Sequence, residues 1–209
     1  QFPRIHLVIH ESYSRDVMDR LAAGKLDIGV FNSYHAEPPA QAQRLFSSDL
    51  VLLGRRDSPL LRDPTVPLTA LNGLSIVMPP SPNPVEAVVR ERTRDMQLEL
   101  RAELEINSGA MIREVVRRCG RFATTQVHRI EDYLDEGDLA ISRIVEPALT
   151  LHTFCATGAK HRINRASLVV ERCLVSVLGE HFVRLQQAAQ MREARWAQAW
   201  QTAVQTVHS

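Results

Sequence analysis

Cysteine is scarce in this chain of 209 residues, and the three cysteines form no pattern. Cys119, Cys155 and Cys173 lie far apart inside apolar runs, and their number is odd. A disulfide framework usually shows an even set of cysteines, and a zinc site shows close pairs such as C-x-x-C. The sequence therefore favours neither. It predicts buried, reduced thiols in a cytoplasmic protein that carries no metal and no cofactor.

Long hydrophobic runs and an excess of either charge are also missing. No apolar stretch approaches the roughly 18 residues that a membrane helix needs, and no signal-peptide pattern opens the chain. The formal net charge is +1, and the arginines are scattered among acidic residues. This pattern is typical of solvated surface rather than of a DNA-binding face. We expect a soluble chain with no membrane partner and no direct contact with DNA.

What the sequence does contain is an alternation of short apolar runs and amphipathic stretches. Ile5 to His10 alternates apolar and polar residues, the spacing of Val17 and Leu21 predicts a helix, and Leu26 to Phe31 is a second apolar run. Two strands joined by a helix and tight turns predict a parallel βαβ unit. Because the same rhythm continues along the chain, the predicted fold class is α/β.

Two proline-containing segments divide this pattern. Pro79 to Pro84, with the sequence PPSPNP, can be neither the interior of a helix nor a central strand, and Pro147 marks a second crossing. We therefore expect two lobes, one of residues 1–77 plus 149–209 and one of residues 79–147. Ligands of such proteins usually bind between the lobes.

The opening block carries a family resemblance. Residues 3–14 read PRIHLVIHESYS and residues 21–30 read LAAGKLDIGV, which resembles the start of the effector-binding region of LysR-type transcriptional regulators. The resemblance covers most of residues 1–186. It implies a two-lobed fold like that of the type 2 periplasmic binding proteins, with two crossover strands. It further implies that the family's first strand and first helix, and its N-terminal winged helix-turn-helix, are missing from this chain.

The same resemblance implies how such a chain works. A small-molecule effector, with organic acids as one candidate class, closes the two lobes and changes the geometry of a homodimer or homotetramer. DNA is then contacted only through the absent N-terminal domain. The alternative is a stand-alone two-lobed solute-binding protein, or an enzyme on the same fold.

Eight small polar residues are candidates for effector binding. Each also has a purely structural reading, as a helix cap, a turn residue or part of a linker. The resemblance favours Ser14, which aligns with an effector-contacting hydroxyl of the family, and the others follow from helix starts, strand ends and the proline segment. The candidates are Ser12, Ser14, Asn32, Ser33, Ser81, Asn83, Ser108 and Gly109.

The second lobe departs from the family where a glycine-rich "G-x-G-I-a-l-L-P" strand is usual. This chain retains Gly120 and has Gln126 in place of the proline. His6 and His10 would lie roughly 13 Å apart on a strand, which is too far to share a metal ion. There is also no G-x-S-x-G nucleophile motif and no phosphate-binding loop. The sequence therefore does not predict an enzyme.

Overall fold

The computed structural model describes residues 5–39, 42–127, 137–158 and 165–184. They form a mixed α/β fold. The helices are α1 (Ser14–Ala22), α2 (Pro84–Asp95), α3 (Gly109–Cys119), a helix at residues 165–184, and two short 3-10 turns, η1 (Pro59–Leu61) and η2 (Leu68–Leu71). The strands are β1 (Ile28–Ser33), β2 (Ala42–Arg55), β3 (Thr65–Pro67), β4 (Ser75–Met78), β5 (Arg101–Glu105), β6 (Phe122–Gln126), β7 (Leu139–Val145) and β8 (Thr150–Thr157).

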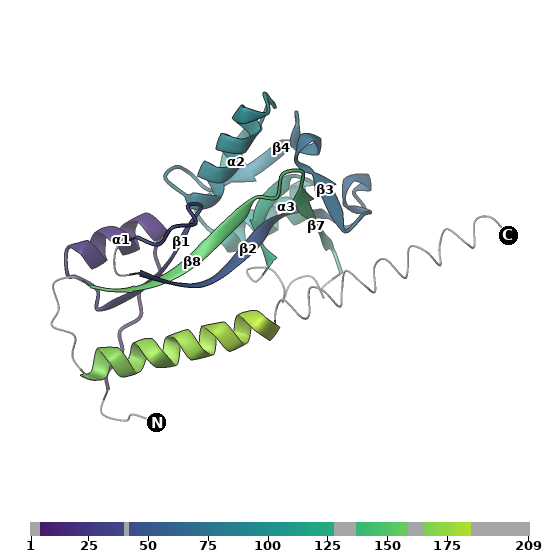
Figure 1. Ribbon diagram of the computed structural model, residues 1–209. Helices are drawn as coiled ribbons and strands as arrows, with labels where there is room; N and C mark the ends of the chain where they lie inside the picture. Colours follow the sequence, from purple (N-terminus) through teal and green to yellow (C-terminus); the bar gives the residue numbers. More distant parts are fainter. Residues whose placement is uncertain (1–4, 40–41, 128–136, 159–164, 185–209) are drawn as a thin grey trace.

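The eight strands form one sheet whose two halves share the long strand β2 (Figure 1). The main order is β1-β8-β2-β6-β4-β5, with β7 beside β2 and β3 beside β7. Residues Ala42 to Asp49 of β2 pair with β8, and Leu50 to Arg55 pair with β6 and β7. We call β1, β8 and the start of β2 the first half, and the remaining strands the second half. The junction is the point in β2 where its pairing changes.

Strand direction brings several strand ends to this junction. β1 is antiparallel to β8, and β6 is antiparallel to β2. The last residue of β6, Gln126, pairs with Leu50, and the last residue of β1, Ser33, pairs with His152 near the same level. Because β4 runs parallel to both β5 and β6, their carboxyl ends also face this side. Loops after such ends are the usual place for ligands in α/β sheets.

Helices cover both faces of each half. In the first half, Val17 and Leu21 of α1 pack in one buried cluster with Phe31. Phe182 of helix 165–184 stacks on Phe46, with ring centroids 4.0 Å apart. Figure 1 shows α1 and this helix on either side of β8 and the start of β2.

Two further buried clusters lie around the second half, and the larger one also includes Leu151 of β8. Val88 and Val89 of α2 join the largest buried cluster with β4 and the middle of β2, whereas Val116 of α3 packs with Ala123 in another. The period of these apolar residues matches the helix period, so α2 and α3 each bury one stripe. The loops at the junction lie at the edge of these packed elements.

The expected first strand at residues 5–10 is wrong. These residues are not in a strand, and the side chains of Leu7, Val8 and Ile9 are 58%, 67% and 88% exposed. β1 pairs only with β8, in the antiparallel sense, so residues 5–33 form no parallel βαβ unit. A unit of this kind forms further along the chain, from β4, α2 and β5. An alternating pattern makes a strand only where a neighbouring strand accepts its backbone hydrogen bonds, and none of the described strands pairs with residues 5–10.

The expected lobe limits remain a prediction, but the strand pairing favours another place for the first crossing. β3 and β4, which precede Pro79, pair with strands of the second half. The PPSPNP segment connects β4 to α2. β2 (Ala42–Arg55) is long enough to pair with strands of both halves. We therefore propose that the chain crosses within β2, and again between β7 and β8.

Candidate functional site

The start of α1 lies against the end of β1. The backbone N–H of Asn32 donates a hydrogen bond to Ser14 Oγ at 3.0 Å. Ser14 is the first helical residue, and the cap position belongs to Tyr13, whose side chain makes no capping bond. Ser12 Oγ donates to Asp16 Oδ2 at 2.6 Å and is exposed. Ser14 is therefore not a helix cap; its hydroxyl fixes α1 to the end of β1.

A chain of neutral side chains continues from Asn32 across the junction. Asn32 Nδ2 donates to Gln126 Oε1 at 3.2 Å, and Asn32 Oδ1 accepts from Thr153 Oγ1 at 2.7 Å. Gln126 Nε2 in turn donates to Ser48 Oγ at 2.7 Å. The Gln126 side chain is fully buried. These bonds bring together the ends of β1 and β6, the middle of β8 and the junction of β2.

The other helix starts on this side belong to the second half. Asn83 Oδ1 accepts from the backbone N–H of Val85 at 2.9 Å and caps α2. Ser108 Oγ accepts from the N–H of Met111 at 3.4 Å and caps α3, of which Gly109 is the first residue. Tyr13 Oη donates to the carbonyl oxygen of Asn107 at 2.9 Å. The N-termini of α1 and α3 are thus joined across the two halves.

Two candidates stand apart from this group. Ser81 is exposed, in the loop between β4 and α2, and its side chain makes no hydrogen bond with the described residues. Ser33 Oγ accepts from the backbone N–H of His35 at 3.0 Å and stabilises the turn after β1. Their part in binding remains a prediction. Ser14 and Asn32 lie together at the junction, with Ser108 and Gly109 across from them.

The electrostatics of this group are set by amides, hydroxyls and helix ends rather than by charged side chains. Among the described residues, none of the bonds made by Asn32, Ser48 or Gln126 involves a charged side chain. The free N–H groups at the starts of α1 and α3 add partial positive charge. Such a site suits oxygen acceptors.

Two further polar groups lie on strands beside the junction. His152 lies next to Thr153, and its Nδ1 is 2.7 Å from Ser47 Oγ. Burial lowers the pKa of His152, and the nearby Arg44 lowers it further, so the ring is neutral near pH 7. Thr124, two residues before Gln126, carries a buried hydroxyl with no partner among the described residues.

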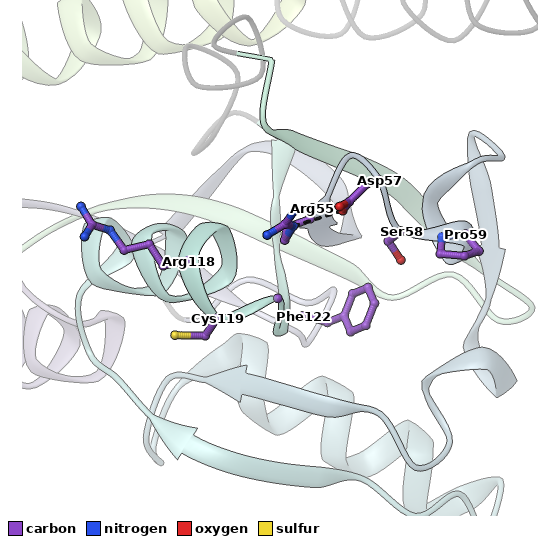
Figure 2. A pocket seen from close by; sticks show the side chains of 8 residues that line it. Arg55, Asp57, Ser58, Pro59, Arg118, Cys119 and Phe122 are labelled. Atoms are coloured by element: carbon purple, nitrogen blue, oxygen red, sulfur yellow. Dashed lines mark hydrogen bonds and ion pairs between the residues drawn. The ribbon is translucent and has the colours of Figure 1, made fainter.

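A separate cavity of about 440 Å³ lies at the far end of α3 (Figure 2). Because α3 has 11 residues, this cavity is roughly 16 Å from Ser108. Its lining residues are Arg55, Asp57, Ser58, Pro59, Arg118, Cys119, Gly120 and Phe122.

The cations of this cavity already have partners. Arg55 Nη2 lies 2.7 Å from Asp57 Oδ2 in an exposed ion pair, and this bond lowers the pKa of the Asp57 carboxyl. Arg118 pairs with Glu114. The lining is therefore close to electrically neutral, and the cavity does not attract an anion as an unpaired arginine would.

The prediction of buried thiols is right for one cysteine and wrong for two. Cys155 is buried, and burial raises the pKa of its thiol to about 11, with Glu171 adding to the rise. Cys119 and Cys173 are exposed. Across the described residues, no group of three or more His, Cys, Asp or Glu side chains could hold a metal ion. No helix in that part of the chain has the length and apolarity to cross a membrane.

The fold is that of a type 2 periplasmic-binding-like protein. The two halves of its mixed β-sheet meet at a polar junction. The family model of the LysR substrate binding domain matches residues 1–190. The chain belongs to this family of effector-binding domains of transcriptional regulators. This membership favours the regulator over the stand-alone solute-binding protein or enzyme.

Solved structures support the fold. The regulatory domain of CcmR from Synechocystis PCC6803, in complex with 2-PG, is 20% identical, with a TM-score of 0.68, and the match covers 79% of this chain and 80% of that one. A probable LysR-family regulator domain from Rhodococcus sp. RHA1 is 17% identical, with a TM-score of 0.69 and coverages of 84% and 86%. The QuiR effector-binding domain in complex with shikimate is 13% identical, with a TM-score of 0.65 and coverages of 81% and 79%. No curated protein sequence matches this chain.

Proposed function

We propose that this chain senses a small polar metabolite at the junction between the two halves of its sheet, and is not an enzyme. The observation that carries the proposal is the side-chain network of Asn32, Gln126, Ser48 and Thr153, which joins the strand ends of both halves. A ligand placed there contacts both halves at once. It shifts their arrangement only by its difference in affinity for the two arrangements.

The chemistry of the junction supports a ligand rich in oxygen acceptors and carrying at most one negative charge. Asn32 and Gln126 each use one amide hydrogen in the network, and an amide has two. Helix starts favour one carboxylate, but no cationic side chain takes part in the network to neutralise a second. Two proteins of similar fold, CcmR and QuiR, were solved in complex with 2-PG and shikimate, respectively.

The regulatory part of the proposal follows from the family. We infer a cytoplasmic regulator that works as a homodimer or homotetramer and contacts DNA through a separate DNA-binding domain. In this arrangement, the effector changes the angle between subunits and hence the position of the DNA-binding domains. The 209-residue chain by itself is then not expected to select an operator sequence in a gel-shift assay at physiological salt.

The experiment is a melting-temperature screen of small organic acids and polyols, shikimate included, followed by calorimetry on each compound that stabilises the chain. A ligand at about 100 times its Kd adds roughly 2.7 kcal/mol to the stability of the folded state. Ser14→Ala is expected to weaken binding, because it removes a hydroxyl at the junction. Ser58→Ala, in the cavity at the far end of α3, is the matched control. Loss of binding in the control alone would contradict the proposed location.

A further inference from the structure

We propose that Gln126 is a positioning residue that latches the two halves of the sheet together before any effector binds. The inference rests on the proposed function, because it concerns the same junction. It starts from the side chain itself, which is 0% exposed and bonded in both directions. Gln126 stands where the family pattern has proline, a residue whose side chain can make neither bond.

The side chain of Gln126 is hydrogen-bonded to two strands. It is the last residue of β6 in the second half, and both of its side-chain partners belong to the first half. Its Oε1 accepts from Asn32 at the end of β1, and its Nε2 donates to Ser48 in the early part of β2. One amide therefore holds two strands of the other half at once. A shift of either strand by more than about 1 Å would break a bond of normal length.

The consequence for the site is that Asn32 is held in a single orientation. Its amide lies between Gln126 and Thr153, and its backbone N–H is bound to Ser14 Oγ. The bonds with Gln126 and Thr153 hold the Asn32 side chain, and the bond with Ser14 holds its backbone. Without Gln126, the Asn32 amide keeps only Thr153, and the end of β1 loses its contact with β6.

Other contacts across the halves lie elsewhere, and they include the packing of Leu151 of β8 in the cluster of β4 and α2. Tyr13 Oη reaches the Asn107 carbonyl at the outer edge of the junction. Asp49 links Thr150 at 2.7 Å and Arg143 at 3.8 Å, between β8 and β7. Neither contact involves Asn32. Gln126 is thus the described residue of the second half whose side chain positions Asn32.

The test is hydrogen–deuterium exchange on the ligand-free 209-residue chain, resolved to single amides by NMR. Gln126→Met keeps the length of the side chain and removes both hydrogen bonds. We expect the Asn32 amide to exchange on the order of tenfold faster, since a lost buried hydrogen bond has about that effect on a local opening equilibrium. Amides of the β4–β6 pairing, such as that of Ala123, should keep their rates. Gln43→Met, at an exposed position of β2, is the matched control and should change neither.

A milder variant keeps the proposal testable if Gln126→Met does not fold. Ser48→Ala removes one of the two bonds of Gln126 and leaves Asn32 untouched, and it should accelerate the same amide by a smaller factor. Equal acceleration of the Asn32 and Ala123 amides would mean general destabilisation and would overturn the latch. An unchanged Asn32 amide in either folded variant would overturn it as well. Because no effector is present, these results are independent of whether the junction binds one.

Discussion

The contact between α1 and β1 can be tested by adding a single methyl group at Gly29. A Cβ atom at this position would lie 2.6 Å from Val17 Cγ1 and 2.7 Å from Leu21 Cδ1. Normal carbon contacts are about 3.5–4.0 Å, so α1 must move outward by roughly 1 Å. Both side chains are buried, at 7% and 6% exposure, and therefore have little freedom to turn away.

The expected cost of Gly29→Ala follows from two opposing effects. Overpacking a tight contact costs about 1–3 kcal/mol. Replacing glycine in a conformation that alanine tolerates recovers about 0.4–1 kcal/mol through the unfolded chain. We expect a net loss of about 1–2 kcal/mol. For a chain of this length, that loss lowers the melting temperature by roughly 2–8 °C.

The assay is thermal and urea denaturation of Gly29→Ala beside a matched glycine substitution. Gly179, in helix 165–184, has no atom within 4 Å of an added Cβ, so Gly179→Ala should stabilise by about 0.5–1 kcal/mol. Combining Val17→Ala with Gly29→Ala restores space, and the double variant should lose less than the sum of the single losses. If Gly29→Ala is as stable as the unmodified chain, the described packing of α1 is refuted.

Three further outcomes are expected. Ser14→Ala should destabilise the chain by about 1–3 kcal/mol in urea denaturation, because the N–H of Asn32 loses its acceptor. An unchanged urea midpoint would show that this hydroxyl does not stabilise the fold. Burial and the nearby Arg44 lower the pKa of His152 in the folded state. The contribution of His152 to stability is therefore present above the ordinary pKa and falls as the pH drops below about 6.5. Melting curves of His152→Gln should lack this part of the pH dependence, and a pH profile identical to that of the unmodified chain would contradict it. In the folded chain at pH 8, iodoacetamide should label the two exposed cysteines and spare Cys155, whose thiol pKa is about 11, and labelling of all three at equal rates by mass spectrometry would contradict its burial.

The sequence was sufficient for elements whose signals are local. Ser108 was expected as a possible helix cap, and it caps α3. Asn83 was read as part of the proline linker, although Asn before Pro84 is a usual helix-start signal, and it caps α2. The apolar spacing along α3 is likewise typical of a helix, and Val116 on that stripe is buried. In these segments the capping atoms and the buried face lie within a few residues of each other, so the local sequence contains the whole cause.

Features that depend on residues far apart in the sequence could not be predicted from the sequence. The alternating residues 5–10 have the pattern of a strand, but only a neighbouring strand could make them one. Cys119 shares the apolar spacing of α3, yet it lies at the end of the helix beside Gly120, where the sheet no longer covers it. Gln126 was noticed only as a departure from the family pattern. Its role depends on Asn32, which is 94 residues away in the chain.

The free energy of the side-chain hydrogen bonds across the junction is similar to the stabilisation that binding of a small ligand provides. The neutral hydrogen bonds across it are those from Asn32 to Gln126, from Gln126 to Ser48 and from Tyr13 to Asn107. At about 0.5–1.5 kcal/mol each, they contribute roughly 1.5–4.5 kcal/mol in total. A ligand at about 100 times its Kd contributes about 2.7 kcal/mol, which lies within that range. These bonds are therefore weak enough for a ligand to change them, whereas the buried cluster of β4 and α2, which includes Leu151 of β8, keeps the two halves in contact.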